Sequence, residues 1–470
     1  MPSGGAGERN DRRCHMRLKL LEFSEWSKEY QGPMCSVLNG ISAVALPRRR
    51  TGPDTRCLER PWLSWYKFDT SAATLTRARE RAFVAFFHLG ALYGLATALS
   101  VIRIGMLGTR GVPASYSGFE TCVEELGTRL AARGHDVTVY CRVPHITYKG
   151  AAYRGMRLVK LPTIRSKHLD TITHGLLSAV HALSRRYDIT LFFNVGCSIV
   201  TWIPRLAGQR VVLNVDGLDW KRKKWGRMAR WYIRASERWA RRFPHRVVTD
   251  SQRVREYYLA RYGAPSPTYI AYGAEPMTVP PGRYLAQYGL LPGRYVLFVG
   301  RLVPENCAHH LVESFVGLAT DFRCVIVGDA PYAAPYINRL RATTDPRVIF
   351  TGYLFGEGYR ELAGNAYCVV ETSEVGGTHP AVLEAMALGR CVVVNDTPEN
   401  LETIADAGYS YEGSVGAASL RTVLERLLKD PAIVQETGER ARERVREHYS
   451  WESITDAYEQ LFLELLSGTR

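Results

Sequence analysis

The feature of the sequence that most restricts its fold is an alternation of short apolar runs with longer helix-like stretches, which begins at Ile102. The runs form two series, first at 102–108, 136–141, 189–194, 210–215 and 246–250, and then at 295–300, 322–328, 348–352, 367–371 and 391–395. Such alternation predicts parallel sheets with helices on both faces. A Pro-rich segment, 275–282, separates the two series and is typical of a linker.

We therefore predict an α/β protein with two Rossmann-like domains, residues 101–280 and 290–448, whose parallel sheets face a central cleft. A last helical segment, 449–470, follows the second domain. Ligands of such sheets bind outside the carboxyl ends of the strands, so the cleft is the predicted site.

Residues 1–100 show no sustained helix or strand period. The run from Ala82 to Ile102 lacks charged residues and is long enough to cross a bilayer. It continues directly into the first predicted strand, which argues against a span, and it lies too far from Met1 for a signal peptide. Three interpretations stay open: a membrane span, a poorly ordered or surface-lying extension, and a mis-annotated segment upstream of a translation start near Val101.

Composition narrows the class of partner. The chain has 61 Lys and Arg against 46 Asp and Glu, and its net charge of +15 suggests an anionic partner such as phosphate, a membrane surface or nucleic acid. Its ten cysteines include no C-x-x-C pair, which excludes a zinc or redox motif of that kind and a disulfide scaffold. We expect reduced thiols in a cytoplasmic protein.

Two loops that follow predicted strands have residue types suited to a sugar or phosphate ligand. The loop 108–120 is rich in glycine and precedes a helix, although its glycines do not match the dinucleotide fingerprint. Arg301 follows the strand 295–300 and could hold a diphosphate in a fork geometry. The alternatives are a tight strand-to-helix turn for the loop and a surface position for the arginine.

The segment 371–389 is the most informative part of the chain. Pro380 suits the first position of a helix that Thr378 or His379 would cap. The preceding glycines, 376 and 377, leave the helix N-terminus open to an anion. Glu384, one turn into the helix, could accept hydrogen bonds from ribose or sugar hydroxyls.

The segment 221–242 contains ten Lys and Arg and one acid, Glu237, with Trp and Tyr between them. A basic helix with interfacial aromatic residues suits the surface of an anionic bilayer. The alternative is a solvated helix whose aromatic side chains pack inward. No nucleic-acid module accompanies the basic segment, so we expect no nucleic-acid partner.

Together these stretches resemble the retaining GT-B glycosyltransferases of family 4, the group 1 glycosyl transferases, and most closely bacterial cell-surface polysaccharide rhamnosyltransferases. The resemblance covers 102–466 and rests on five motifs in order: GTRGVPASYSGFET, NVDGLDWKRKKWG, GRLVPEN, EVGGTHPAVLEAMALG and VVNDTPEN. It implies the GT-B fold, with a closing helix at Trp451–Leu466 that crosses back to the first domain.

The resemblance also implies roles for residues. Catalytic roles fall on Asp216, Glu374 and Arg301. Donor-binding roles fall on Gly111, Arg301, Asn306, Gly376, Gly377, Thr378, His379 and Glu384. Acceptor-binding roles fall on Tyr116, Gly118, Phe119, Glu120, Asp219, Trp220 and Lys221.

Three positions depart from the family pattern. Glu374 and Glu384 are spaced more widely than the family's two acids, the first of which would fall at Gly376. Asn306 stands where a lysine is common, so one phosphate counter-charge is missing, which Lys221 or Arg110 could replace. Asp216 stands where many relatives have a histidine.

The expected reaction is transfer of a sugar from a nucleotide-diphospho-sugar, with rhamnose from dTDP-rhamnose as the best candidate, to a lipid-linked or polysaccharide acceptor. The resemblance implies retention of configuration without a metal or cofactor, and the sequence has no paired-aspartate motif at a strand end that would require Mg²⁺. We expect a protein at the inner face of a bacterial membrane, bound through 221–242. The alternatives are a nucleotide-sugar epimerase of the same fold and a non-catalytic basic binding protein.

Overall fold

The computed structural model of the 470-residue chain describes residues 101–114, 118–166, 169–222 and 225–468. The predictions made for 1–100 therefore lie outside the described residues, which all belong to one structural unit, 91–470. Among the described residues, no helix has the length and apolar character needed to cross a membrane.

The first sheet has eight strands in the order β3-β4-β2-β1-β5-β6-β7-β8, and all neighbours are parallel except β3 and β4. The strands are β1 (Arg103–Leu107), β2 (Asp136–Arg142), β3 (Ala152–Tyr153), β4 (Met156–Leu161), β5 (Ile189–Phe193), β6 (Arg210–Val215), β7 (Arg246–Thr249) and β8 (Thr268–Tyr269). The helices that join them are α4 (Gly118–Ala132), α5 (Asp170–Leu183), α6 (Arg227–Arg242) and α7 (Gln252–Tyr262), with short 3₁₀ turns η1 (Val195–Val200), η2 (Pro204–Ala207) and η3 (Asp219–Lys221).

The second sheet has six parallel strands in the order β11-β10-β9-β12-β13-β14. They are β9 (Tyr295–Val299), β10 (Arg323–Val327), β11 (Val348–Gly352), β12 (Cys368–Glu371), β13 (Cys391–Asn395) and β14 (Tyr409–Tyr411). The helices of this half are α8 (Arg283–Gln287), α9 (Ala308–Val316), α10 (Ala334–Arg341), α11 (Gly356–Gly364), α12 (Pro380–Ala387), α13 (Pro398–Ile404), α14 (Ala417–Lys429) and α15 (Pro431–His448), with 3₁₀ turns η4 (Pro304–Asn306) and η5 (Pro331–Ala333).

The two predicted parallel sheets are thus confirmed, and the structure adds four strands that the apolar runs did not predict: β3, β4, β8 and β14. β3 and β4 form an antiparallel hairpin that the apolar pattern did not predict. Both turn residues, Arg154 and Gly155, have positive φ angles of 45° and 82°. A two-residue turn of this kind can join only antiparallel strands, whereas parallel strands need a long crossover.

The last helix, α16 (Trp451–Ser467), packs against α4 of the first half. Its buried Tyr458 hydroxyl accepts a hydrogen bond of 2.6 Å from the side-chain amide of Asn214 in β6. Arg133, just after α4, forms ion pairs with Glu452 and Glu459. α16 and α4 share one core cluster, while α5, α6 and α7 contribute to another. The helices therefore cover the two faces of the first sheet in separate groups, as right-handed crossovers require.

Candidate active site

The carboxyl ends of the two sheets meet at Asp250, which follows β7. The backbone N–H of Thr378 donates to Asp250 Oδ2 over 2.9 Å, and Thr378 Oγ1 donates to the Asp250 backbone oxygen over 2.6 Å. Thr378 lies between β12 and α12, where Pro380 takes the first helical position as predicted. The loop that resembles a donor-binding loop therefore contacts the first sheet directly.

Two glycines permit this approach. A Cβ atom on Gly217 would overlap the backbone of Gly376, and a Cβ atom on Gly377 would overlap the Asp250 carboxyl group. No larger residue fits either position without displacing backbone or a buried carboxyl. The structure thus brings Asp216, which precedes Gly217, to the loop 376–378, as expected for a site in the cleft.

Asp250 is a site residue that the sequence analysis missed. Burial, and then the charge of Asp216, raise the pKa of Asp250 well above its usual value, although the hydrogen bond from Thr378 opposes the rise. The hydroxyl of Tyr272 is buried beside both carboxyls, and its pKa is also raised, first by burial. A buried carboxyl beside a second carboxylate favours its protonated form, because ionising both in such surroundings is costly.

Asp250→Asn is expected to remove a pH dependence of stability. The folded-state pKa of Asp250 exceeds its unfolded value, so the folded state retains a proton that the unfolded state releases. The contribution of Asp250 to the free energy of unfolding is therefore largest below about pH 4 and is lost as the pH rises through the raised pKa. Asparagine can still accept from Thr378 but cannot ionise, so the melting temperature of the variant relative to wild type should rise between about pH 5 and 8.

The exposed Asp406 supplies the matched control for this measurement. Asp406→Asn should leave the melting temperature parallel to that of wild type over the same pH range. Parallel curves for Asp250→Asn as well would show that the Asp216–Asp250 pair does not hold the extra proton.

The Asp216 carboxylate interacts electrostatically with Arg222, the residue after Lys221. The Arg222 side chain is buried, and its Nε donates to Asp219 Oδ1 over 2.7 Å. Burial lowers the pKa of Arg222, but the charges of Asp219 and Asp216 outweigh that effect and raise it overall. Glu305 of the second half also contributes to this rise. Lys221, expected to bind acceptor or replace a phosphate counter-charge, is exposed.

Arg301 and Asn306 lie in one turn after β9. The Arg301 backbone oxygen accepts hydrogen bonds from the Asn306 side-chain amide (3.0 Å) and from Val303 N (2.9 Å). Thr372 Oγ1 donates in turn to the Asn306 backbone oxygen. Asn306 therefore stabilises the turn that carries Arg301 and links it to the end of β12. At the position where a lysine is common, this protein therefore has a residue that holds the turn together instead of a positive charge.

His379 occupies the space that the family's first acid would need. A Cβ atom on Gly376 would overlap the His379 ring, so a glutamate there would require this ring to move. His379 Nδ1 lies 3.9 Å from Glu371 Oε2, and the other Glu371 oxygen accepts from Ser373 N over 2.9 Å. Glu371, buried at the end of β12, is a second carboxylate that the sequence analysis missed. The backbone N–H of Glu374 donates to the backbone oxygen of Glu305 over 3.0 Å.

Glu384 lies in the second turn of α12. Burial raises the pKa of Glu384, while a hydrogen bond with Tyr359 of α11 opposes the rise. A carboxyl group in such surroundings is able to accept hydrogen bonds from ligand hydroxyls when ionised. Its predicted ribose-binding role stays a prediction.

The loop 108–120 is held by carboxylates from α4. Glu120 Oε1 accepts from Arg110 N over 2.9 Å, and Glu124 Oε2 accepts from Ala114 N over 2.6 Å. Gly111 has a φ angle of 106° and lies against Cys141, where a side chain would overlap the sulfur. The loop therefore folds over the end of β2, with Glu120 buried beneath it.

The end of this loop reaches α12. A Cβ atom on Gly118 would lie 2.7 Å from Pro380 Cγ, so the start of α4 contacts the start of α12. Phe119 packs against Phe193, with ring centroids 6.0 Å apart. Trp220 carries the Arg234 guanidinium 4.2 Å from its ring centroid. Tyr116 lies outside the described residues.

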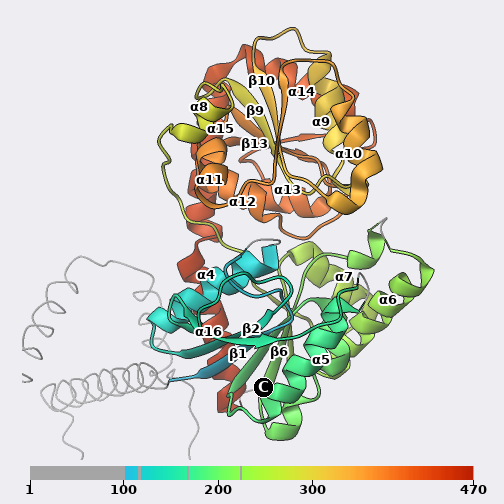
Figure 1. Ribbon diagram of the computed structural model, residues 1–470, viewed down its shortest axis with the longest axis vertical. Helices are drawn as coiled ribbons and strands as arrows, with labels where there is room; N and C mark the ends of the chain where they lie inside the picture. Colours follow the sequence, from blue (N-terminus) through green and yellow to red (C-terminus); the bar gives the residue numbers. More distant parts are fainter. Residues whose placement is uncertain (1–100, 115–117, 167–168, 223–224, 469–470) are drawn as a thin grey trace, which may run out of the picture. The chain divides into compact units, whose positions relative to one another are not determined.

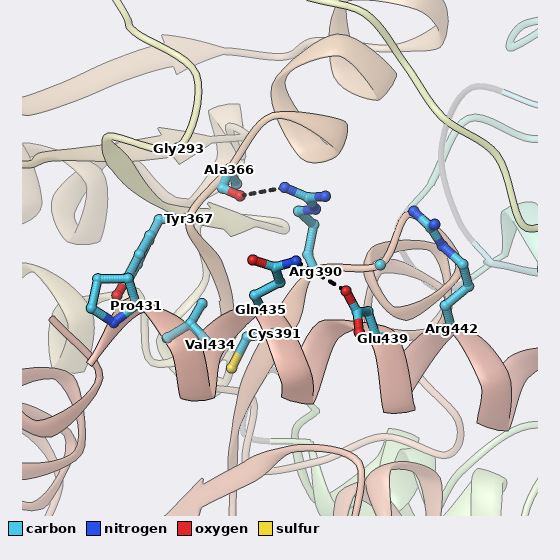
Figure 2. A pocket seen from close by; sticks show the side chains of 11 residues that line it. Gly293, Ala366, Tyr367, Arg390, Cys391, Pro431, Val434, Gln435, Glu439 and Arg442 are labelled. Atoms are coloured by element: carbon cyan, nitrogen blue, oxygen red, sulfur yellow. Dashed lines mark hydrogen bonds between the residues drawn. The ribbon is translucent and has the colours of Figure 1, made fainter.

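A pocket of about 330 Å³ lies elsewhere, between α15 and the amino ends of β12 and β13 (Figure 2). Arg390 and Arg442 line it, and both donate to the Leu388 backbone oxygen just after α12. Their charges therefore cap a helix C-terminus. None of the predicted site residues lines this pocket.

Three side chains at the start of α9 could in principle hold a metal ion, since potential ligand atoms of Cys307, His309 and His310 lie within 4.8 Å of one another. Each already has a protein partner. Cys307 Sγ donates to Pro304 O over 3.3 Å, and each histidine Nδ1 lies 3.0 Å from a tyrosine hydroxyl. That the reaction needs no metal stays a prediction from the family resemblance.

Comparison with known families divides the chain in the same way as the sheets. Residues 101–275 match a family described as a domain of unknown function (DUF1972), and residues 293–430 match the family described as glycosyl transferases group 1. The second half is a group 1 glycosyltransferase domain.

One curated relative of this chain extends over both halves. Alpha-maltose-1-phosphate synthase from Mycolicibacterium smegmatis is 26% identical over 76% of this chain and 97% of its own length. N-acetyl-alpha-D-glucosaminyl L-malate synthase from Bacillus anthracis is 29% identical over 38% of this chain and 48% of its own. The first of these similarities covers the DUF1972 half as well.

Solved structures confirm the GT-B fold. Sucrose-phosphate synthase from Thermosynechococcus elongatus superposes with a TM-score of 0.65 at 21% identity, over 78% of this chain and 100% of that one. Anabaena Alr3699/HepE in complex with UDP and glucose superposes with a TM-score of 0.62 at 17% identity, over 78% and 100%. The predicted group 1 glycosyltransferase resemblance is thus confirmed at the level of family and fold. The rhamnosyltransferase likeness and the retention of configuration stay predictions.

Proposed function

We propose that the protein transfers a sugar from a nucleotide-diphospho-sugar to an acceptor hydroxyl bound between its two sheets. The contact between Thr378 and Asp250 carries this proposal. It brings the N-terminus of α12 against the carboxyl end of β7, so a ligand held before α12 faces the first sheet. Arg301 emerges from the neighbouring strand of the same sheet, β9, to meet a diphosphate in this region.

The reaction breaks the bond between the sugar C1 and the diphosphate oxygen through an oxocarbenium-like state. Negative charge develops on the leaving diphosphate, where Arg301 and the backbone N–H groups before α12 stabilise it. The acceptor oxygen forms the new bond to C1, and its proton passes to the Asp216 carboxylate or to the leaving phosphate. Attack on the same face, with retention and without a metal, is the course that the family resemblance favours.

The names of the relatives suggest which donor nucleotide to test. Alr3699/HepE has been solved with UDP-glucose, and the M. smegmatis relative is a maltose-1-phosphate synthase. These names make UDP-glucose a donor to test beside dTDP-rhamnose, which the sequence motifs favour. For the acceptor we propose a lipid-linked glycan at the inner face of a bacterial membrane, supported by the basic surface of α6.

Thermal unfolding of the full chain with dTDP, UDP, GDP or NAD tests the donor class. A ligand at 100 times its dissociation constant stabilises the folded state by about 2.7 kcal/mol, which raises the melting temperature measurably. We expect one nucleoside diphosphate to stabilise wild type and not Arg301→Ala. Stabilisation by NAD alone, or by none of the four, would contradict the proposal.

A further inference from the structure

Helix α5 exposes apolar side chains along the side that faces away from the sheet. His174, Ser178, Ala179 and Ala182 are buried on its inner side. The outer side carries an apolar stripe whose residues are each between 38% and 51% exposed. The stripe consists of Leu169, Leu176, Leu177, Val180 and Leu183. Single exposed leucines are ordinary, but a row of them at helical spacing marks a surface that binds something.

The turn η2 extends this stripe. It packs against α5, and its Leu206 is 72% exposed. The Arg205 guanidinium of η2 donates to the Phe243 backbone oxygen, at the end of α6, over 2.7 Å. Trp202, just before η2, is also exposed. An apolar surface therefore connects α5 with the C-terminal end of α6.

The outer side of α6 is basic. Its exposed charged residues are all arginines: Arg227, Arg230, Arg234, Arg238, Arg241 and Arg242. The one acid of the helix, Glu237, is buried and accepts hydrogen bonds from Tyr257 (3.0 Å) and Tyr262 (2.7 Å). Met228 and Trp231 are 82% and 67% exposed among the arginines. α6 thus presents positive charge and large apolar groups without a neutralising carboxylate.

α5, η2 and α6 lie on one face of the first sheet. α5 and α6 both pack against η1, and both contribute to the same core cluster. Figure 1 shows these two helices over the same region of the sheet, in green. α4 and α16 belong to the other cluster and so cover the opposite face. We call the outer surface of α5, η2 and α6 the docking face.

We propose that the docking face lies on an anionic lipid bilayer. The stripe on α5, together with Met228 and Trp231, would enter the interfacial region, while the arginines of α6 contact phosphate headgroups. A nucleic acid would satisfy the arginines and leave the apolar stripe in water. A second copy in symmetric contact would offer the arginines no acid, since the described part of the face exposes none on α6.

The inference deepens the proposed function and, in this respect, rests on it. α5 and α6 follow β4 and β6, so their N-termini lie near the carboxyl ends of these strands, the edge that carries Asp216. Docking through this face would therefore hold the cleft close to a lipid-linked acceptor. Lipid binding itself is measured without any nucleotide, which keeps the two proposals separable.

Sedimentation of the full chain with vesicles tests the inference. The vesicles are phosphatidylcholine alone, or equal parts of phosphatidylcholine and phosphatidylglycerol. We expect wild type to bind the anionic vesicles at least about tenfold more tightly, with affinity falling as salt increases. One variant removes the stripe, Leu176→Ser with Val180→Ser and Leu183→Ser. Another removes charge, Arg227→Gln with Arg230→Gln and Arg238→Gln. Each should weaken binding at least about tenfold.

Matched controls come from the second half. Leu291→Ser with Val316→Ser and Val415→Ser changes three exposed apolar residues, and Arg339→Gln with Arg341→Gln and Arg446→Gln changes three exposed arginines. Both controls should bind vesicles as wild type does. All four variants should keep the wild-type melting temperature and its shift with nucleoside diphosphate, which excludes misfolding.

Other outcomes would overturn the proposal. Unchanged vesicle binding by both docking-face variants would show that the face does not contact lipid. Conversion of a wild-type dimer to a monomer by the stripe variant, with no effect on vesicle binding, would assign the face to a second copy. Tighter binding of wild type to polyuridylic acid than to anionic vesicles, lost only in the arginine variant, would assign it to nucleic acid.

Discussion

Arg301→Ala is expected to reduce sugar transfer by at least about two orders of magnitude while the protein stays folded. The guanidinium is placed by a turn whose backbone is fixed independently of it, through Asn306 and Val303. Truncation at Cβ therefore leaves the turn intact. What is lost is the positive charge that meets the leaving diphosphate, where negative charge grows in the transition state.

Initial rates of donor consumption with acceptor present, and thermal unfolding with nucleoside diphosphate, measure this effect. Arg446→Ala on the exposed surface of α15 is the control and should retain wild-type rates. Arg301→Lys keeps the charge without the fork geometry and should recover only part of the activity. Normal turnover by Arg301→Ala would remove its role at the diphosphate.

Arg222→Ala is expected to lower the free energy of unfolding by about 3 kcal/mol and to abolish transfer. The side chain is buried, so its removal leaves the Asp219 and Asp216 carboxylates without the cation that they face. Breaking a buried ion pair by removing one partner costs more than the pair contributes, because an uncompensated charge stays in the interior. The neighbouring Lys221→Ala should leave the free energy of unfolding unchanged, since Lys221 is exposed.

A structural role for Arg222 can be separated from a role at the ligand. Arg222→Lys retains charge and much of the packing, so it should recover most of the melting temperature. If Arg222 supplies the counter-charge that Asn306 lacks, the KM of this variant for the donor should still rise, because lysine cannot reproduce the guanidinium geometry. Wild-type kinetics in Arg222→Lys would restrict the residue to a structural role. Wild-type stability in Arg222→Ala would contradict the buried ion pair itself.

The sequence was sufficient for the fold because its signals are local. Apolar runs of strand length, separated by helix-length stretches, predicted both parallel sheets. Pro380 marked the first position of α12, and Gly134, with a φ angle of 93°, lies just beyond α4, where a glycine favours the end of a helix. These residues act through their own backbone preferences, which adjacent sequence reveals. The family motifs likewise placed Arg301 and the loop 376–378 at strand ends facing the site.

The partners of these residues could not be predicted in this way. Asp250 and Thr378 are 128 positions apart, and the contact between them depends on how two separate sheets meet. Nothing in the segment Thr249-Asp250-Ser251 distinguishes a buried carboxyl from a surface one. The same holds for Arg222 and its basic neighbour Lys221, because the sequence does not show that the first is buried and the second exposed.

The sequence alone therefore determined which elements form and which loops carry chemistry. The tertiary structure decided which carboxyl holds the loop before α12, which cation faces Asp216, and which side of α5 is exposed. α5 buries a histidine, a serine and small residues while its leucines are exposed, so its sequence pattern alone did not give its orientation. Periodicity records the local geometry of a helix or strand, whereas charge pairing and burial depend on neighbours that only the packed chain supplies.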